Sequence, residues 1–411
     1  MDRKQVGAWA LYDFANSVFP AVMTTAVFPI FYTTVVVVGE GGVGTSWWGN
    51  ALSLSALIVA VTSPLLGAIA DRSGARKRFM YSYVAVCVGA VALMTTLQSG
   101  MALWGFILFV VANVGFEGAN VFYNSYLPDI APPERRGSVS GLGFGVGYFG
   151  SAVGLIMVLP FVDQPPVMWL LVSGFFLFFS LPALFFLPKD EPTGVGLGEA
   201  ARWGLTNFRV ILAEVWENKE LRNFLFAFFF YIDGVLTIIG MAGIVASETF
   251  GFDRNEVIVL FLVVQFSALV GAFALSRPTD ILGPKRVLHG VILLWIVVGV
   301  SAYFIEDRNV FFGLAVVAGL GLGSLQSASR AFMASLVPDG KEAEMFGFYA
   351  LCGRASSIIG PALFGFVTLA AGGNQRPGFL ALTGLFVIGW LLLTRVTDPV
   401  AVRRAEAAGR G

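Results

Sequence analysis

Four polar side chains on one helical face have the chemistry of a ligand-binding surface. Asn113, Glu117, Asn120 and Asn124 lie in the stretch ANVGFEGANVFYNSY. At roughly 100° per helical residue they form a stripe about 60° wide. The surrounding run is apolar and long enough to cross a bilayer, where a carboxylate costs on the order of 2.5–3.5 kcal/mol, so the stripe cannot face lipid. The pattern predicts a polar cavity bounded by other helices.

Hydrogen bonding between helices is an alternative interpretation of this stripe. Amides that bond across membrane helices contribute typically about 0.6 kcal/mol each. Such bonds would account for one or two of the asparagines, but they explain Glu117 poorly. We hypothesise that Glu117, or Asp13 near the N-terminus, exchanges a proton as the cavity alternates between the two sides of the membrane.

A second polar face lies in the first apolar run. Asp13 and Asn16 share about 100° of helical arc with Ser17 and Thr24. Prolines in the same run remove backbone donors and favour a bend, which is common in helices that move during transport. The alternative for Asp13 is a carboxylate at a helix end near the cytoplasmic interface.

Polar side chains inside apolar runs of the second half complete the candidate set: Asp233, Gln326, Arg330 and Arg354. With the two carboxylates of the first half, they would give a cavity that carries both signs of charge. Such a cavity suits a zwitterion, for example an amino acid or a small peptide. The alternatives are buried arginine–carboxylate pairs without a ligand, and for Arg330 an anchor at the cytoplasmic end.

The composition requires membrane helices to position these residues. The 411 residues are 57% hydrophobic and 13% charged, with a mean hydropathy of +0.79. Soluble chains have roughly 25% charged residues, so we expect an all-α membrane protein. Runs of sufficient length predict twelve spans, at residues 8–37, 49–70, 79–98, 102–126, 138–160, 167–187, 223–245, 255–276, 287–305, 310–333, 345–371 and 378–396.

The same composition argues against several partners. Lys and Arg balance Asp and Glu at 26 each, which gives no indication of a nucleic-acid partner. A single histidine and two cysteines inside apolar runs form no ligand cluster, so we expect no metal site and no cofactor.

Positive charges indicate the orientation. Of the 26 Lys and Arg residues, Arg330 and Arg354 lie inside spans, and only Arg254, Arg308 and Arg376 lie in one set of loops. The other 21 occupy the opposite loops and the two termini. By the positive-inside rule both termini are expected to be cytoplasmic.

The two halves of the chain repeat. Leu127-Pro128-Asp129 recurs 210 residues later as Val337-Pro338-Asp339. An offset near half the chain length indicates a parallel repeat with an axis along the membrane normal, as in some secondary transporters. Phe208, Ile211, Leu212 and Val215 have helical spacing and predict an amphipathic helix between the halves. The predicted parts are a six-helix bundle (1–187), a cytoplasmic linker with that helix (188–222), a second six-helix bundle (223–396) and a cytoplasmic tail (397–411).

A cytoplasmic turn between the second and third spans resembles the signature loop of the major facilitator superfamily. Its residues are Asp71, Arg72, Gly74 and Arg76, and a partial copy 209 residues later holds Asp280, Gly283 and Lys285. The glycine allows a tight turn, and the acid can cap a helix N-terminus from the other half. The resemblance implies a role in gating. The alternative is that the basic residues only fix the topology.

The first span has a more specific resemblance. Trp9-Ala-Leu-Tyr12-Asp13-Phe14-Ala15-Asn16-Ser17, followed by Phe28-Pro29 and Tyr32, is similar to the opening helix of the vacuole-effluxer branch of that superfamily. This branch is named for a fungal autophagy-related vacuolar amino-acid exporter. The resemblance implies a transporter of two pseudo-symmetric six-helix bundles in which Asp13 and Asn16 matter.

These observations predict a secondary active transporter rather than an enzyme. We expect a monomer in the cell membrane that moves a small polar metabolite by alternating access, with efflux and proton coupling as hypotheses. The alternative is a non-transporting membrane sensor or assembly protein with the same fold. A membrane enzyme is disfavoured because no nucleophile–base set is evident.

Overall fold

The computed structural model describes residues 1–39, 42–191, 193–400 and 402. The described residues form helices and no strand. In the first half the helices are α1 (Arg3–Asn16), η1 (Pro20–Ala26), α2 (Phe28–Phe31), η2 (Tyr32–Val36), α3 (Val43–Ser73), α4 (Arg76–Leu93), η3 (Met94–Thr96), α5 (Ala102–Ser125), α6 (Leu127–Ile130), η4 (Pro133–Arg135), α7 (Arg136–Val158), η5 (Leu159–Phe161) and α8 (Pro165–Phe186).

The second half continues this pattern. After α9 (Leu197–Thr206) and α10 (Phe208–Glu217) of the linker, its helices are α11 (Lys219–Glu248), α12 (Arg254–Ala274), α13 (Ser276–Leu282), α14 (Pro284–Phe304), α15 (Arg308–Leu336), α16 (Glu342–Ala355), η6 (Ser356–Ile358), α17 (Ile359–Ala370) and α18 (Arg376–Thr394). Residues 401 and 403–411 of the predicted tail lie outside the described part of the chain.

The described residues contain eleven helices that are long and apolar enough to cross a membrane, and a twelfth if one bent pair is counted as a single span. The twelve predicted spans agree with this count. The bent pair is the first span, where Arg3–Ala26 meets Phe28–Val36 at 41°. The irregularity follows from proline, since two π-helical segments occur here and the first begins at Pro20, a residue that cannot donate to the preceding turn.

The helices group into two compact units. Unit 1 holds Met1–Ile130, Val146–Ile211 and Pro338–Leu351, and unit 2 holds Ala131–Gly145, Leu212–Val337 and Cys352–Gly411. Each unit therefore contains a segment from the other half of the sequence. The first part of α7 belongs to the unit built mainly from the second half, and the first part of α16 belongs to the unit built mainly from the first.

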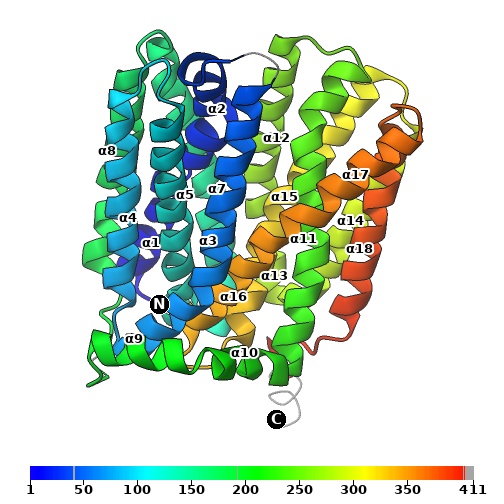
Figure 1. The fold of residues 1–411 in the computed structure, drawn as a ribbon. Helices are drawn as coiled ribbons and strands as arrows, with labels where there is room; N and C mark the ends of the chain where they lie inside the picture. The colour runs from blue at the N-terminus through cyan, green and yellow to red at the C-terminus, as the bar shows by residue number, and fades with distance from the viewer. Residues whose placement is uncertain (40–41, 192, 401, 403–411) are drawn as a thin grey trace. The chain divides into compact units, whose positions relative to one another are not determined.

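Unit 1 is packed through small residues and aromatic rings. In Figure 1, α4 lies beside α5 and α8, in agreement with their contacts. Gly115 on α5 allows the close approach of α4, since a Cβ there would lie 2.7 Å from the backbone nitrogen of Cys87. Trp9 and Tyr123 stack with ring centroids 4.7 Å apart, and the Trp9 indole donates to the Tyr123 carbonyl.

The segment between the halves carries two helices. α10 forms where the sequence predicts an amphipathic helix, whereas α9 was not expected. α9 packs across the end of α3 (Figure 1), with Gly204 against Ile69. The guanidinium of Arg72 stacks 4.2 Å from the Trp203 ring centroid. A cation–π contact of this kind contributes about 0.5–1 kcal/mol at an exposed site.

Unit 2 depends on a tight contact between α12 and α15. A Cβ on Gly271 would lie 2.1 Å from the Leu320 carbonyl oxygen, and a Cβ on Gly323 would lie 1.8 Å from that of Ala268. Only glycine permits these backbones to approach so closely, as is common where membrane helices pack through small residues.

We expect Gly323→Ala to destabilise the protein by about 1–3 kcal/mol, because the added methyl group must push α12 and α15 apart. Thermal unfolding of the detergent-purified protein would measure the effect. Gly313→Ala on the same helix is the matched control, since a Cβ there meets nothing within 4 Å. Equal midpoints for the two variants would contradict the proposed packing.

Candidate functional site

Asp71 binds the start of a distant helix within unit 1. Its carboxylate accepts hydrogen bonds from the backbone nitrogens of Ala343 at 3.1 Å and Glu344 at 2.8 Å, in the first turn of α16. Four residues earlier, a Cβ on Gly67 would lie 2.3 Å from the Ala343 carbonyl oxygen. The glycine brings α3 and α16 close enough for the acid to bind N–H groups that have no partner inside their own helix.

Asp280 makes the equivalent interaction within unit 2. It accepts from the backbone nitrogens of Gly137 at 2.7 Å and Ser138 at 3.0 Å, and also from the Ser138 hydroxyl. These nitrogens lie in the first turn of α7. The structure thus places both sequence-predicted gating acids at helix N-termini.

The glycines that follow these acids have positive φ. Gly74 ends α3 at φ +58°, and Gly283 precedes α14 at φ +92°. A side chain would be strained in either conformation. At Gly74 it would also collide with the linker, because a Cβ would lie 2.2 Å from the Glu191 carbonyl oxygen.

Arg76 connects the Asp71 region to several acids. It pairs with Asp129 at 2.7 Å, and its other N–O distances are 3.6 Å to Glu342 and 3.8 Å to Asp190. The guanidinium also lies 5.0 Å from the ring centroid of Tyr126. The sequence predicted a role for Arg76 but named none of these partners.

Asp190 and Lys77 fasten the chain where it leaves α8. The Asp190 carboxylate accepts from the backbone nitrogen of Lys77 at 2.8 Å and from the Tyr126 hydroxyl at 2.9 Å. The Lys77 ammonium donates to the carbonyls of Leu184 and Leu187, which end that helix. One acid therefore caps the start of α4 while one lysine caps the end of α8.

Unit 2 repeats part of this arrangement, 208 residues later. Lys285 donates to the Thr394 carbonyl at the end of α18, at 3.1 Å. Asp398 lies against Gly283, where a Cβ would be 2.5 Å from its Oδ2. Lys285 follows Lys77 by 208 residues, and Asp398 follows Asp190 by the same number. This equal offset was a signal in the sequence that the two arrangements repeat.

In the predicted polar stripe of α5, Asn113 and Glu117 are buried, and Asn120 and Asn124 are half-buried. Asn113 donates to the hydroxyl of Ser55 on α3 at 2.7 Å, and Asn16 of α1 donates to the Asn120 carbonyl at 2.8 Å. Glu117 is 7% exposed and interacts electrostatically with Cys87 of α4. Hydrogen bonding between helices thus accounts for two of the three asparagines, and the structure brings Asn16 and Asn120 together as one polar contact.

The remaining candidates occupy several environments. Asp13 is buried in α1, and its backbone carbonyl accepts from the Ser17 hydroxyl. Asn124 on α5, Gln326 on α15 and Arg354 on α16 are half-buried. The first-half set lies in unit 1 and the second-half set in unit 2. The shared cavity between them stays a prediction.

Arg330 binds the first part of α7. Its guanidinium donates to the Ser140 hydroxyl at 3.0 Å and to the Ser140 carbonyl at 2.9 Å, and it lies 4.0 Å from the ring centroid of Phe144. Only 3% of Arg330 is exposed. This arginine therefore holds the first part of α7 within unit 2, and its role toward a ligand stays a prediction.

Asp233 is fully buried in the middle of α11. Its carboxylate accepts from the backbone nitrogen of Gly360 at 2.8 Å, at the start of α17. Asp233 therefore accepts from a backbone N–H in the first turn of a helix, as Asp71 and Asp280 do.

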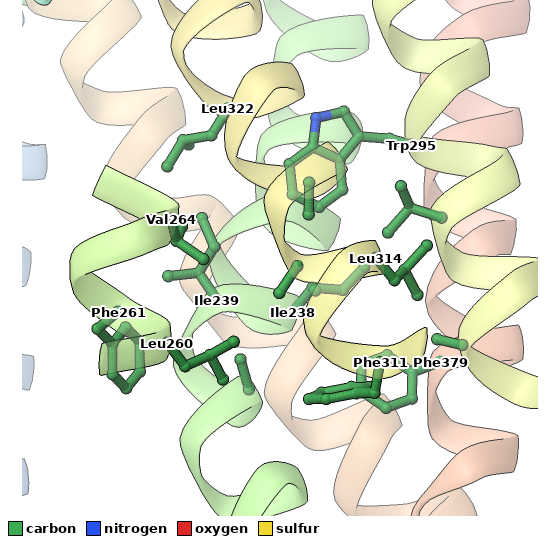
Figure 2. A pocket seen from close by; sticks show the side chains of 15 residues that line it. Ile238, Ile239, Leu260, Phe261, Val264, Trp295, Phe311, Leu314, Leu322 and Phe379 are labelled. Carbon is green, nitrogen blue, oxygen red and sulfur yellow. The ribbon is translucent and has the colours of Figure 1, made fainter. Parts of the chain in front are cut away.

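An apolar cavity of about 50 Å³ lies inside unit 2. Figure 2 shows its side chains, among which Ile238, Leu260, Phe311 and Leu322 offer only carbon atoms. The indole of Trp295 is the polar group in this wall, and its Nε1 lies against α15 at Gly321. Such a lining does not suit a polar metabolite.

No group of three or more metal-ligating side chains occurs among the described residues.

Comparisons with known proteins agree with this architecture. Residues 43–406 match the family model described as "Vacuole effluxer Atg22 like". The uncharacterized MFS-type transporter YxiO of Bacillus subtilis (strain 168) is 34% identical over 417 residues, which cover 96% of this chain and 95% of that protein. Autophagy-related protein 22 of Coccidioides immitis (strain RS) is 25% identical over 84% of this chain and 71% of its own. The human organic anion transporter MFSD10 has a similar fold, with a TM-score of 0.76 at 15% identity, covering 95% of this chain and 99% of that one.

We expect Asp190→Ala to destabilise unit 1 by about 0.5–2 kcal/mol, the usual effect of removing an N-cap acceptor. Thermal unfolding in detergent would measure it. Glu191→Ala is the matched control, because it removes a neighbouring acid whose side chain is exposed. A midpoint for Asp190→Ala equal to that of the control would refute the capping role.

We expect Ala315→Val to stabilise the protein by up to about 1 kcal/mol, because the added methyl groups fill an apolar cavity that costs roughly 24 cal/mol per Å³. Ala315→Ser, whose hydroxyl can donate to the backbone carbonyl one turn earlier but adds little volume, should change the midpoint less than Ala315→Val does. The order of the two unfolding midpoints checks the cavity, and a reversed order would contradict it.

Proposed function

We propose that this chain, which belongs to the Atg22-like vacuole effluxer family and is a major facilitator superfamily transporter, moves a small polar metabolite by alternating access. The observation that carries this proposal is the pair of contacts in which Asp71 binds the start of α16 and Asp280 binds the start of α7. Each contact joins residues from the two sequence halves.

These two contacts are suited to opening and closing. A carboxylate at a helix N-terminus is stabilising by about 0.3–1 kcal/mol at exposed sites and up to about 2 kcal/mol when partly buried. Two such contacts can hold one side of the transporter closed, yet their combined energy is small enough for substrate binding to overcome. Asp71 also lies near Arg76, whose several acidic partners can keep the arginine paired when the contact breaks.

An amino acid or small peptide is the substrate class that the candidate residues favour. The candidate residues Asp13 and Glu117 are acidic and Arg354 is basic, and a zwitterion carries both of the complementary charges. We further propose that transport is coupled to protons, that both termini are cytoplasmic and that the protein works as a monomer in the cell membrane. The uneven distribution of Lys and Arg between the two sets of loops supports this orientation.

The transport proposal predicts that Asp71→Ala and Asp280→Ala each slow exchange. The test uses full-length protein in liposomes and a panel of radiolabelled amino acids and dipeptides, with and without a pH gradient. For a substrate that the unmodified protein moves, losing either contact should reduce uptake by about tenfold, since about 1.4 kcal/mol shifts a two-state equilibrium by that factor.

Glu191→Ala serves as the control for loss of an exposed acid at the same end of unit 1. Full activity in Asp71→Ala and Asp280→Ala would exclude the gating role. Failure of the unmodified protein to move any compound in the panel would instead favour the sensor alternative.

A further inference from the structure

The eleventh predicted span, Glu342–Ala370, is one continuous helix that loses its regular α-helical form at one point within unit 2. α16 ends at Ala355, a short 3-10 segment follows, and α17 begins at Ile359. Pro361 accounts for the break, because it has no N–H with which to continue the helical hydrogen bonds through residue 357. At such an irregular segment a backbone N–H can bond to an acceptor outside its own helix.

The same position in the first half is continuous. Gly150 lies 210 residues before Gly360, the offset of the sequence repeat, and α7 passes through it without interruption from Arg136 to Val158. Gly150 packs on α1, since a Cβ there would lie 2.3 Å from the Phe14 carbonyl oxygen. At this position of the repeat, the helix is regular in the first half and is interrupted by a 3-10 segment in the second.

Asp233 is the acceptor at this break. It accepts from the Gly360 nitrogen at 2.8 Å, and the Thr237 hydroxyl lies 3.5 Å from its Oδ1. The fit is tight, because a Cβ on Gly360 would lie 2.1 Å from the Thr237 hydroxyl and 2.6 Å from Asp233 Oδ1. The carboxylate and the start of α17 therefore hold each other in place.

No cation neutralises this carboxylate among the described residues. η6 and α17 carry no ionisable side chain, and neither Cys352 nor Arg354 of α16 bonds to Asp233. α12 carries ionisable groups only at its first turn, and Tyr231 on α11 itself bonds to Ser329. The arginines of α15 and α18 have other partners: Arg330 binds Ser140, Arg308 pairs with Glu256, and Arg376 pairs with Glu306.

We propose that Asp233 is the proton-binding group of this transporter and that its protonation releases the start of α17. With α17 in place, the ionised carboxylate is stabilised by the Gly360 N–H and the helix dipole. When α17 moves away, the carboxylate loses this partner in apolar surroundings and takes up a proton from water, and it returns the proton when the contact re-forms. The assignment rests on the proposed function, and it selects Asp233 over Glu117 and Asp13.

The test needs no transported substrate. Cys352 lies four residues before the break and is half-buried, whereas Cys87 is fully buried. Maleimide labelling of the full-length protein in detergent therefore reports opening at the break, with each rate divided by that of the denatured protein at the same pH. Cys352→Ser should abolish the labelling. In parallel, infrared difference spectra between low and high pH detect a protonated carboxylic acid directly.

We expect labelling of the unmodified protein to rise as the pH falls. Asp233→Asn should label about tenfold faster at high pH, because a neutral amide oxygen is a weaker acceptor for the Gly360 N–H than a carboxylate, and it should lose the pH dependence. Its infrared spectrum should lack one carboxylic acid band. Gly360→Ala keeps Asp233 but forces its carboxylate and the start of α17 apart, so Cys352 in this variant should label rapidly at every pH. Gly365→Ala is its control, because a Cβ there meets nothing within 4 Å.

An unchanged labelling profile in both Asp233→Asn and Gly360→Ala would overturn the proposal, as would an infrared spectrum of Asp233→Asn that retains every carboxylic acid band of the unmodified protein. If Asp233→Asn does not fold, Gly360→Ala and the infrared spectrum of the unmodified protein still decide the question. These readouts are independent of uptake, so a failure of the transport assay alone would count against the proposed function and not against this site.

Discussion

A carboxylate that accepts the free N–H groups of a helix N-terminus is the interaction on which this structure depends. Asp71 caps α16, Asp280 caps α7, Asp233 caps α17 and Asp190 caps α4. The first N–H groups of a helix have no partner inside that helix, so where the helix end is packed in protein they need a protein acceptor. Because the acceptor comes from another helix, one contact fixes both the end of a helix and its neighbour. This explains why the first parts of α7 and α16 belong to units built mainly from the other half of the sequence.

Glycine makes these contacts possible. Gly137 and Gly360 donate to the acids directly, and a Cβ on either would lie within 3 Å of a side chain from the partner helix. Gly67 has the same effect one turn before Asp71. The carboxylates provide the favourable interaction, and the glycines let the neighbouring helices come close enough for it to form. Neither residue type would be sufficient alone.

The sequence predicted the elements whose signals are local or repeated. Apolar runs predicted the twelve spans, and the repeat of Asp71 and Gly74 at Asp280 and Gly283 indicated two equivalent turns. It did not predict the partner of Arg330, because Ser140 and Phe144 are distant in sequence and carry no charge pattern that pairs them with an arginine. The break before α17 was missed for a related reason, since hydropathy does not distinguish a regular helix from one interrupted by a 3-10 segment of the same apolar character.

The asymmetry of the repeat matters more for function than its symmetry. The Asp71 and Asp280 contacts have similar partners and similar lengths, so they do not distinguish one half of the repeat from the other. A bound proton can bias a conformational equilibrium only if its affinity differs between the two states. That difference needs a group whose surroundings change when a helix moves. Gly150 lies in a regular helix, whereas Gly360 follows a 3-10 segment and meets an acid. Movement of the start of α17 would therefore change the environment of the buried Asp233 carboxylate. The equivalent position of the first half, in α7, has no such helix start beside an acid.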